Sequence, residues 1–229
     1  MSQNRFGRRS MILGVPGALS AQQRAGGAKK KEEEEEVSPA EDLMREHGVL
    51  KRALLVYGEC ANSLESGKEF PPTTVTGTAN LIRKFIEDYH EKLEEEYLFP
   101  RFRKAGKLVD LVGVLEAQHK AGRRVTEQIL KTAKTSGLLR NESAKKELTT
   151  QIRAFIRMYE PHEAREDTVL FPAFREIVPK NEYDSLGEEF EKREHKLFGE
   201  EGFHKIVEEV AGLEKTIGIY DLSQFTPRG

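Results

Sequence analysis

The sequence predicts an all-α protein, an antiparallel (up-down-up-down) four-helix bundle with an additional C-terminal helix. Of its 229 residues, 37% are hydrophobic and 33% charged, and none is tryptophan. That balance suits helices with charged outer faces better than sheets. Apolar residues recur at spacings of three and four along four long segments, the pattern of one buried helical face. Short breaks separate the segments, so consecutive helices are expected to run in opposite directions.

Each expected helix is bounded by a recognisable start or stop signal. Ser38 and Pro39 read as an N-cap and the first residue of the first helix, and glycine or proline follows the later ones. The four bundle helices and the additional helix are expected at about residues 39–66, 74–104, 108–135, 142–178 and 182–213. Pro161 falls inside the fourth of these, where a missing backbone donor predicts a kink or a bulge.

The chain divides into three expected regions. Residues 1–37 contain an export-signal-like stretch and the charged low-complexity run KKKEEEEEV, 38–180 form the bundle, and 181–229 form a helix and tail packed on it. Paired arginines, Arg8-Arg9, precede about a dozen mildly apolar residues and then small ones, which resembles a twin-arginine export signal. We therefore expect a periplasmic protein; the alternative is a cytoplasmic protein with a basic tail.

Composition excludes several classes of function. The net charge of -2 argues against a dedicated nucleic-acid binder. No apolar run approaches the roughly 18 residues that a membrane-spanning helix needs. The single cysteine, Cys60, cannot form an internal disulfide and excludes thiolate-rich zinc or iron–sulfur sites, so we interpret it as a buried small hydrophobe.

One phrase occurs twice in the chain. HEKLEEEYLFP begins at His90 and HEAREDTVLFP at His162, and each places a glutamate four residues after its histidine, on the same helical face. A further histidine lies 43 residues before each phrase, at His47 and His119. The chain therefore contains two helical hairpins, each with one histidine on its first helix and a His-x-x-x-Glu motif on its second.

These six ionisable residues lie on the stripes that a plain bundle would fill with leucine. Leaving such groups buried without partners would cost several kcal/mol each, and bound metal removes that cost. Imidazole and carboxylate together suit iron, manganese or zinc, and six donors fit two metals better than one tetrahedral zinc. The predicted metal-binding residues are His47, His90, Glu94, His119, His162 and Glu166.

Over residues 40 to 178, this pattern resembles the hemerythrin-like (HHE cation-binding) family. The resemblance implies a four-helix bundle holding two iron ions in a non-haem centre, with manganese or zinc less expected. It also implies that the four histidines are terminal ligands and that Glu94 and Glu166 are bridging carboxylates. Asp167 competes with Glu166, because oxygen carriers place their last carboxylate five residues after the histidine; Glu166 repeats the spacing of the first copy.

The chain departs from the oxygen-carrying members of that family on the third helix. Those members have a His-x-x-x-His pair there, whereas Leu115 and Arg123 stand four residues from His119. The missing ligand leaves an open or water-filled position, or an extra ligand comes from elsewhere. Glu91, Glu163 and nearby tyrosines are candidates, although we interpret both glutamates as solvated surface carboxylates.

Two other histidines, His195 and His204, lie on the expected fifth helix and are interpreted as surface or packing residues. The ligand set differs from that of ferritin-like oxidases, which use four glutamates and two histidines in Glu-x-x-His motifs. We therefore predict a di-iron protein that binds dioxygen, nitric oxide or peroxide for sensing, storage or detoxification. The alternatives are an oxidoreductase that decomposes peroxide at the same centre and a non-redox, zinc-bound interaction bundle.

Overall fold

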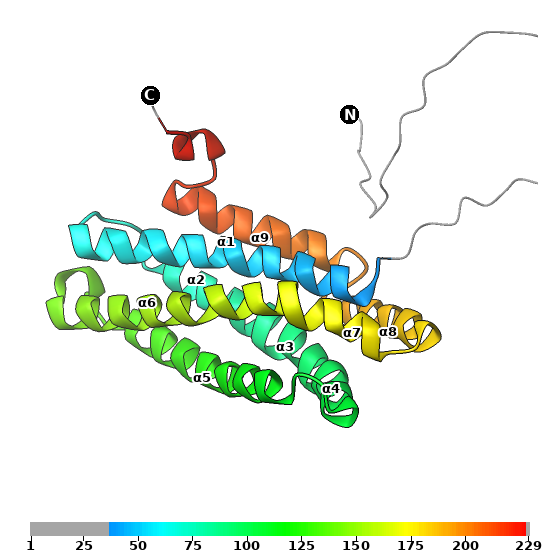
Figure 1. Ribbon diagram of the computed structural model, residues 1–229. Coiled ribbons are helices and arrows are strands. Elements are labelled where there is room, and N and C mark those ends of the chain that lie inside the picture. Colours follow the sequence, from blue (N-terminus) through cyan, green and yellow to red (C-terminus); the bar gives the residue numbers. More distant parts are fainter. Residues whose placement is uncertain (1–36, 228–229) are drawn as a thin grey trace, which may run out of the picture. The chain divides into compact units, whose positions relative to one another are not determined.

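The computed structural model describes residues 37–227, which are helical and contain no strand (Figure 1). The export-signal-like stretch and the charged run lie outside the described residues. Among the helices described, none is both long and apolar enough to cross a membrane.

The first helix, α1 (Pro39–Ser66), begins and ends where its sequence signals predict. The Ser38 hydroxyl accepts a hydrogen bond from the Glu41 backbone, and the Glu41 carboxylate accepts one from the Ser38 backbone. This reciprocal pair satisfies two backbone donors that would otherwise lack partners at the helix start. Gly67 ends the helix in the left-handed conformation, with φ 70°, where a side chain would be strained.

The second and fourth predicted helices are each a succession of α- and π-helical stretches. Residues 73–105 comprise α2 (Thr73–Leu81), η1 (Ile82–His90), α3 (Glu91–Leu93), η2 (Glu94–Leu98) and α4 (Phe99–Ala105), with η1 and η2 wound as π-helix. Residues 142–177 comprise α6 (Glu142–Arg165), the π-helical η4 (Glu166–Leu170) and α7 (Phe171–Ile177). Because π turns often occur at functional sites, these stretches mark the region of the bundle that holds the predicted ligands.

The structure has no bulge at Pro161, where the sequence predicts one. Helix α6 continues through Pro161, and its π-helical turn begins only at Glu166. The length difference between the two copies is taken up in the first, where the nine residues up to His90 wind as a π-helix. A π turn holds more residues than an α turn, so the shorter first copy makes fewer turns before its histidine. The two copies therefore differ in winding rather than by a break at the proline.

The four long segments pack side by side around one apolar core. Helix α1 lies against α6, α5 (Val109–Ala133) lies against α6, and α2 lies against both α5 and α1 (Figure 1). A short 3₁₀ turn, η3 (Leu138–Arg140), joins α5 to α6. Aromatic side chains such as Phe85, Phe99 and Phe171 are fully buried in the core, together with the apolar stripes of the long helices.

The C-terminal region contains two helices where the sequence predicts one. Helix α8 (Lys180–Phe198) and helix α9 (Gly202–Ile217) are separated by a turn at Gly199, and a 3₁₀ turn, η5 (Leu222–Phe225), follows. A β-carbon at Gly202 would lie 2.6 Å from the Phe198 β-carbon, so the chain can reverse this tightly only with glycine there. Both helices contact α1, and Arg52 fixes α9 through two hydrogen bonds to Glu214, at 2.8 and 2.5 Å.

Candidate metal centre

The structure brings all six predicted metal-binding residues together in the core. His47 comes from α1, His90 from the end of η1 and Glu94 from the start of η2, while α5, α6 and η4 supply the other three. None of the six side chains is more than 4% exposed. The π-helical turns begin or end at three of them, which are His90, Glu94 and Glu166.

The six residues form two groups of equal composition. His47, His90 and Glu94 offer one ligand atom each within 4.8 Å of one another, and so do the second set, His119, His162 and Glu166. The carboxylates also reach across. Glu94 Oε2 lies 3.3 Å from His119 Nε2. Glu166 Oε2 lies 3.4 Å from His47 Nε2. Each carboxylate therefore faces both groups, the position that a bridging ligand needs.

Every histidine of the centre is held from outside through its Nδ1 atom. The partners form a closed ring in which each long segment holds the histidine of the next: Glu46 contacts His90 at 2.7 Å, Glu95 contacts His119 at 3.2 Å, Gln118 contacts His162 at 2.9 Å and Asp167 contacts His47 at 2.7 Å. We call these four partner residues, Glu46, Glu95, Gln118 and Asp167, the outer ring. Such contacts fix the ring orientation and leave Nε2 free to bind metal.

The repeated phrase supplies two contacts to one histidine of the opposite hairpin. In the first copy, Glu95 contacts His119 Nδ1 and Phe99 stacks on the same imidazole, with ring centroids 5.5 Å apart. In the second copy, Asp167 and Phe171 do the same for His47, with centroids 5.4 Å apart. The phenylalanine of each Leu-Phe-Pro run therefore helps to orient a ligand as well as to fill the core.

The electrostatics of the centre call for added positive charge. The Oε1 atoms of Glu94 and Glu166 and the Nε2 atom of His90 are buried with no hydrogen-bond partner among the described residues. The Oε2 atoms of the two glutamates face Nε2 atoms of His119, His47 and His162 at 3.1–3.4 Å. Burial and the nearby Glu166 raise the pKa of Glu94, while His162 and His47 overcome burial and lower the pKa of Glu166. Burial also opposes charge on His47, but hydrogen bonds to Asp167 and Glu166 raise its pKa to about 10. In the absence of metal, protons have to neutralise this core.

The donor set fits metal cations. Four imidazole nitrogens and two carboxylates, already desolvated and oriented, match the preferences of iron, manganese or zinc. Binding would give the buried carboxylate oxygens a cation and displace the protons that the core otherwise needs.

Comparison with known proteins agrees with this geometry. Residues 38–174 match the model of the hemerythrin HHE cation-binding domain. The chain belongs to the hemerythrin family. It is also 50% identical, over 191 residues, to proteins of Mycobacterium bovis and of two Mycobacterium tuberculosis strains that are described only as uncharacterised. The match covers 83% of this chain and 74% of each relative. No solved structure matches it.

Arg123 is one of the two residues that stand four positions from His119, the spacing at which oxygen-carrying hemerythrins have a further histidine. Its guanidinium pairs with Glu91 at 2.6 Å and with Glu95 at 2.8 Å, and Tyr159 donates a 2.6 Å hydrogen bond to Glu91. Glu91 is only 1% exposed, so its interpretation as a solvated surface carboxylate is wrong. Two strong partners hold this carboxylate, and in this hemerythrin domain Arg123 acts on His119 through Glu95.

Glu163 is also buried, which corrects its interpretation as a surface carboxylate. It is fully buried and pairs with Lys51 at 2.7 Å. The sequence did not reveal either burial, because the partners of Glu91 and Glu163 lie on other helices, 68 and 112 residues away for Tyr159 and Lys51.

The remaining candidates have distinct positions in this hemerythrin domain. Asp167 binds the outer Nδ1 of His47, whereas Glu166 faces the interior, so the two carboxylates do not compete for one position. His195 and His204 lie on α8 and α9 with side chains 36% and 59% exposed, and each lies near a glutamate of its own helix, at 3.8 and 3.3 Å.

The outer ring is the part of the site that sequence reasoning missed. Its members each stand next to a predicted ligand in the chain, as Glu46 does to His47 and Gln118 to His119. The available signal in the sequence was therefore a polar residue next to each predicted ligand. That signal could not be interpreted from the sequence alone, because each of these residues contacts the histidine of a different segment.

Proposed function

We propose that this protein is a non-haem di-iron protein of the hemerythrin type that binds dioxygen, nitric oxide or peroxide for sensing, storage or detoxification. The observation that supports it best is the outer ring, which orients four imidazoles around two fully buried carboxylates. In this proposal the four long segments form an antiparallel four-helix bundle, the histidines are terminal ligands, and Glu94 and Glu166 bridge.

The protein's own residues would hold the pair of ions and control its surroundings. The outer ring keeps each Nε2 directed inward, and Phe99 and Phe171 limit rotation of two imidazoles while excluding water. Iron in such a site would supply the binding and redox chemistry of small oxygen or nitrogen ligands. The chain offers fewer donors than two octahedral ions take, so room remains for a small molecule.

Arg123 favours a second candidate, an oxidoreductase that decomposes peroxide at the same centre. Neither Leu115 nor Arg123, the residues four positions from His119, is a histidine, and Arg123 pairs with Glu91 and Glu95, so the centre would have one protein ligand fewer than an oxygen carrier. Anaerobic protein mixed with dioxygen would form a stable coloured adduct if it carries oxygen, and would oxidise rapidly if it does not. Evolution of dioxygen from added peroxide would support the enzyme.

Metal analysis with an optical spectrum tests the proposal directly. The purified protein should contain about two iron ions per chain, and absence of both iron and manganese would overturn the redox proposals in favour of a zinc-bound or metal-free bundle. His90→Ala or His162→Ala should lose metal because each removes an oriented, buried donor. His204→Ala is the matched control, since that side chain is 59% exposed. Retention of both metals by His162→Ala would refute the ligand assignment.

We also propose that the protein is exported with its centre already loaded. The support is the Arg8-Arg9 pair, which resembles the signal of a route that carries folded proteins. Cell fractionation and N-terminal sequencing of the native protein test it, with Arg8-Arg9→Lys-Lys as the transport-deficient control. Recovery of the uncleaved chain in the cytoplasm alone would contradict export.

A further inference from the structure

A groove lies on the surface over α1, α6 and the C-terminal segment. Its volume is about 430 Å³, and its walls include Leu54 and Gly58 from α1, Ile156 and Glu160 from α6, and Ile219 and Phe225 from the segment after α9. The last two lie beyond residues 38–174, the part that matches the family. One wall of the groove is therefore built by the extension rather than by the hemerythrin domain.

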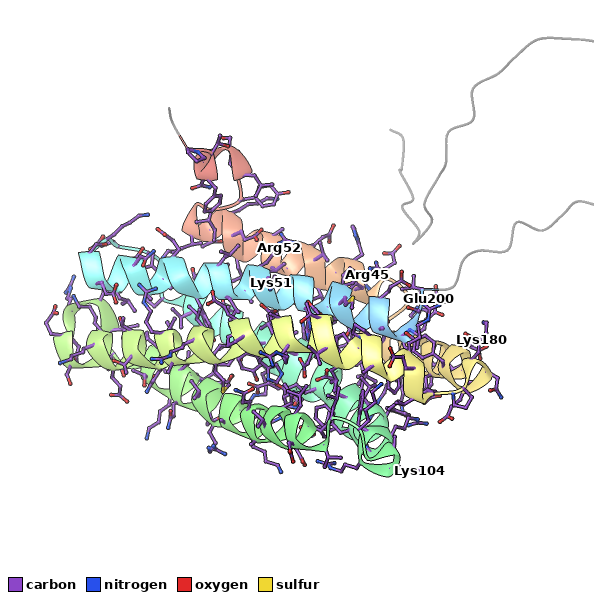
Figure 2. The ribbon with its side chains drawn as sticks, in the orientation of Figure 1. Arg45, Lys51, Arg52, Lys104, Lys180 and Glu200 are labelled. Atoms are coloured by element: carbon purple, nitrogen blue, oxygen red, sulfur yellow. The ribbon has the colours of Figure 1, made fainter. Side chains whose placement is uncertain are left out.

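The groove also contains an ion pair whose two members differ in burial. Lys51, on α1 (Figure 2), keeps its side chain 55% exposed, and its ammonium lies 2.7 Å from Glu163 Oε1. The Glu163 carboxylate is fully buried. Its second oxygen, Oε2, has no hydrogen-bond partner among the described residues. A flexible, half-exposed cation thus covers a buried carboxylate that has an unused acceptor.

This ion pair lies beside the metal centre. Lys51 follows His47 by one helical turn on the same face of α1, and Glu163 directly follows His162. Glu163 and Lys51 both line the groove, so its wall includes residues that stand one position and one helical turn from predicted ligands of the centre.

We propose that the groove is the entrance by which small uncharged molecules reach the metal centre, and that the Lys51–Glu163 ion pair is its gate. This inference rests on the proposed function. A molecule passing inward has to displace the Lys51 ammonium, which can swing into water on its long stem. The buried Glu163 carboxylate behind it repels an anion and leaves a neutral molecule unhindered.

Nitric oxide is the probe of the first test, because it is neutral and its binding is visible optically. With the metal-loaded protein, Lys51→Ala should raise the association rate several-fold by opening the gate. Lys84→Ala is the matched control, since Lys84 forms a 2.7 Å ion pair with Glu209 and does not line the groove. A gate changes association and dissociation by the same factor, so Kd should stay within about twofold.

A blocking variant gives the opposite expectation. An added β-carbon at Gly58 or at Gly48 meets no atom within 4 Å, so a side chain can start from either position of α1 without a clash at its β-carbon. Only Gly58 lines the groove, and Gly58→Leu should slow nitric oxide association several-fold whereas Gly48→Leu should not. Glu163→Gln tests the charge rule: it should speed entry of azide, an anion, more than entry of nitric oxide.

The outcomes separate this inference from the proposed function. If the wild-type protein contains no metal and takes up none, the proposed function is overturned, and the proposed entrance is overturned as well. Full metal content with unchanged nitric oxide rates in Lys51→Ala and Gly58→Leu overturns the entrance alone. A changed Kd at full metal content would show that Lys51 acts on the centre itself, and it would overturn the gate.

Discussion

Replacement of Gly122 by alanine tests how tightly α5 packs on the side chains beside the metal centre. A β-carbon at this position would lie 2.8 Å from Tyr159 Cζ and 2.9 Å from Cε2, with the hydroxyl oxygen closer still. Tyr159 is 1% exposed and donates to the buried Glu91, so it cannot move away without losing that hydrogen bond. Gly122 is therefore required by the position of Tyr159.

The magnitude follows from three effects. Overpacking of a filled core costs about 1–3 kcal/mol. Loss of a hydrogen bond to a charged acceptor costs about 1.5–3 kcal/mol. Against these, alanine favours a helix over glycine by about 1 kcal/mol. We expect Gly122→Ala to lower the free energy of unfolding by about 2–4 kcal/mol, taking the lost contacts together.

Urea denaturation at matched metal content measures the effect. Gly113→Ala is the control in the same helix, because its added β-carbon meets nothing within 4 Å, and it should be neutral or slightly stabilising. In a Tyr159→Phe background the Gly122→Ala penalty should shrink, since the closest contact is gone. A Gly122→Ala protein as stable as the wild type would refute the packing argument.

Three further predictions concern other parts of the molecule. In the metal-free protein the pKa of His47 is raised to about 10 and that of Glu94 to about 8, so at pH 7 both hold protons that metal must displace. Metal affinity should therefore fall as pH drops below about 10 and fall more steeply below about 8, with release of at least two protons per chain loaded at pH 7, measured by calorimetry in buffers of different ionisation enthalpy. Burial raises the pKa of Cys60 to about 12, so iodoacetamide at pH 8 should label this thiol only after denaturation, and rapid native labelling would contradict its burial. Arg52→Ala removes the pair of hydrogen bonds to Glu214 and should cost about 1 kcal/mol, with faster hydrogen exchange in α9 than in α6; equal exchange in both helices would argue against this tether.

The sequence predicted most where the signal is local. The Ser38–Pro39 start and the Gly67 end of the first helix were predictable because capping depends on a few adjacent residues. The six residues that meet in the core stood out because ionisable side chains replaced leucine on apolar stripes. These signals require only the helical period, and the structure places their residues together.

What the sequence did not predict depends on contacts between distant segments. The π-helical winding of η1 compensates a length difference that shows only when two copies are built into one bundle. Likewise, Arg123 and Tyr159 bury Glu91, although its own surroundings in the chain are acidic and suggest solvent. The turn at Gly199 was missed because glycine within an amphipathic pattern does not by itself end a helix.

The outer ring is closed, but its four members are not chemically equal. Three of them are carboxylates, while the fourth, which contacts His162, is the amide of Gln118. An imidazole that shares its Nδ1 proton with a carboxylate is the more electron-rich ligand and favours the higher oxidation state of a bound metal. His47 and His90 both have carboxylate partners, whereas in the other group His119 has a carboxylate and His162 has an amide, so the first group would supply the more electron-rich pair of imidazoles to a bound metal. The two groups would therefore offer a bound metal unequal surroundings, although they have the same composition.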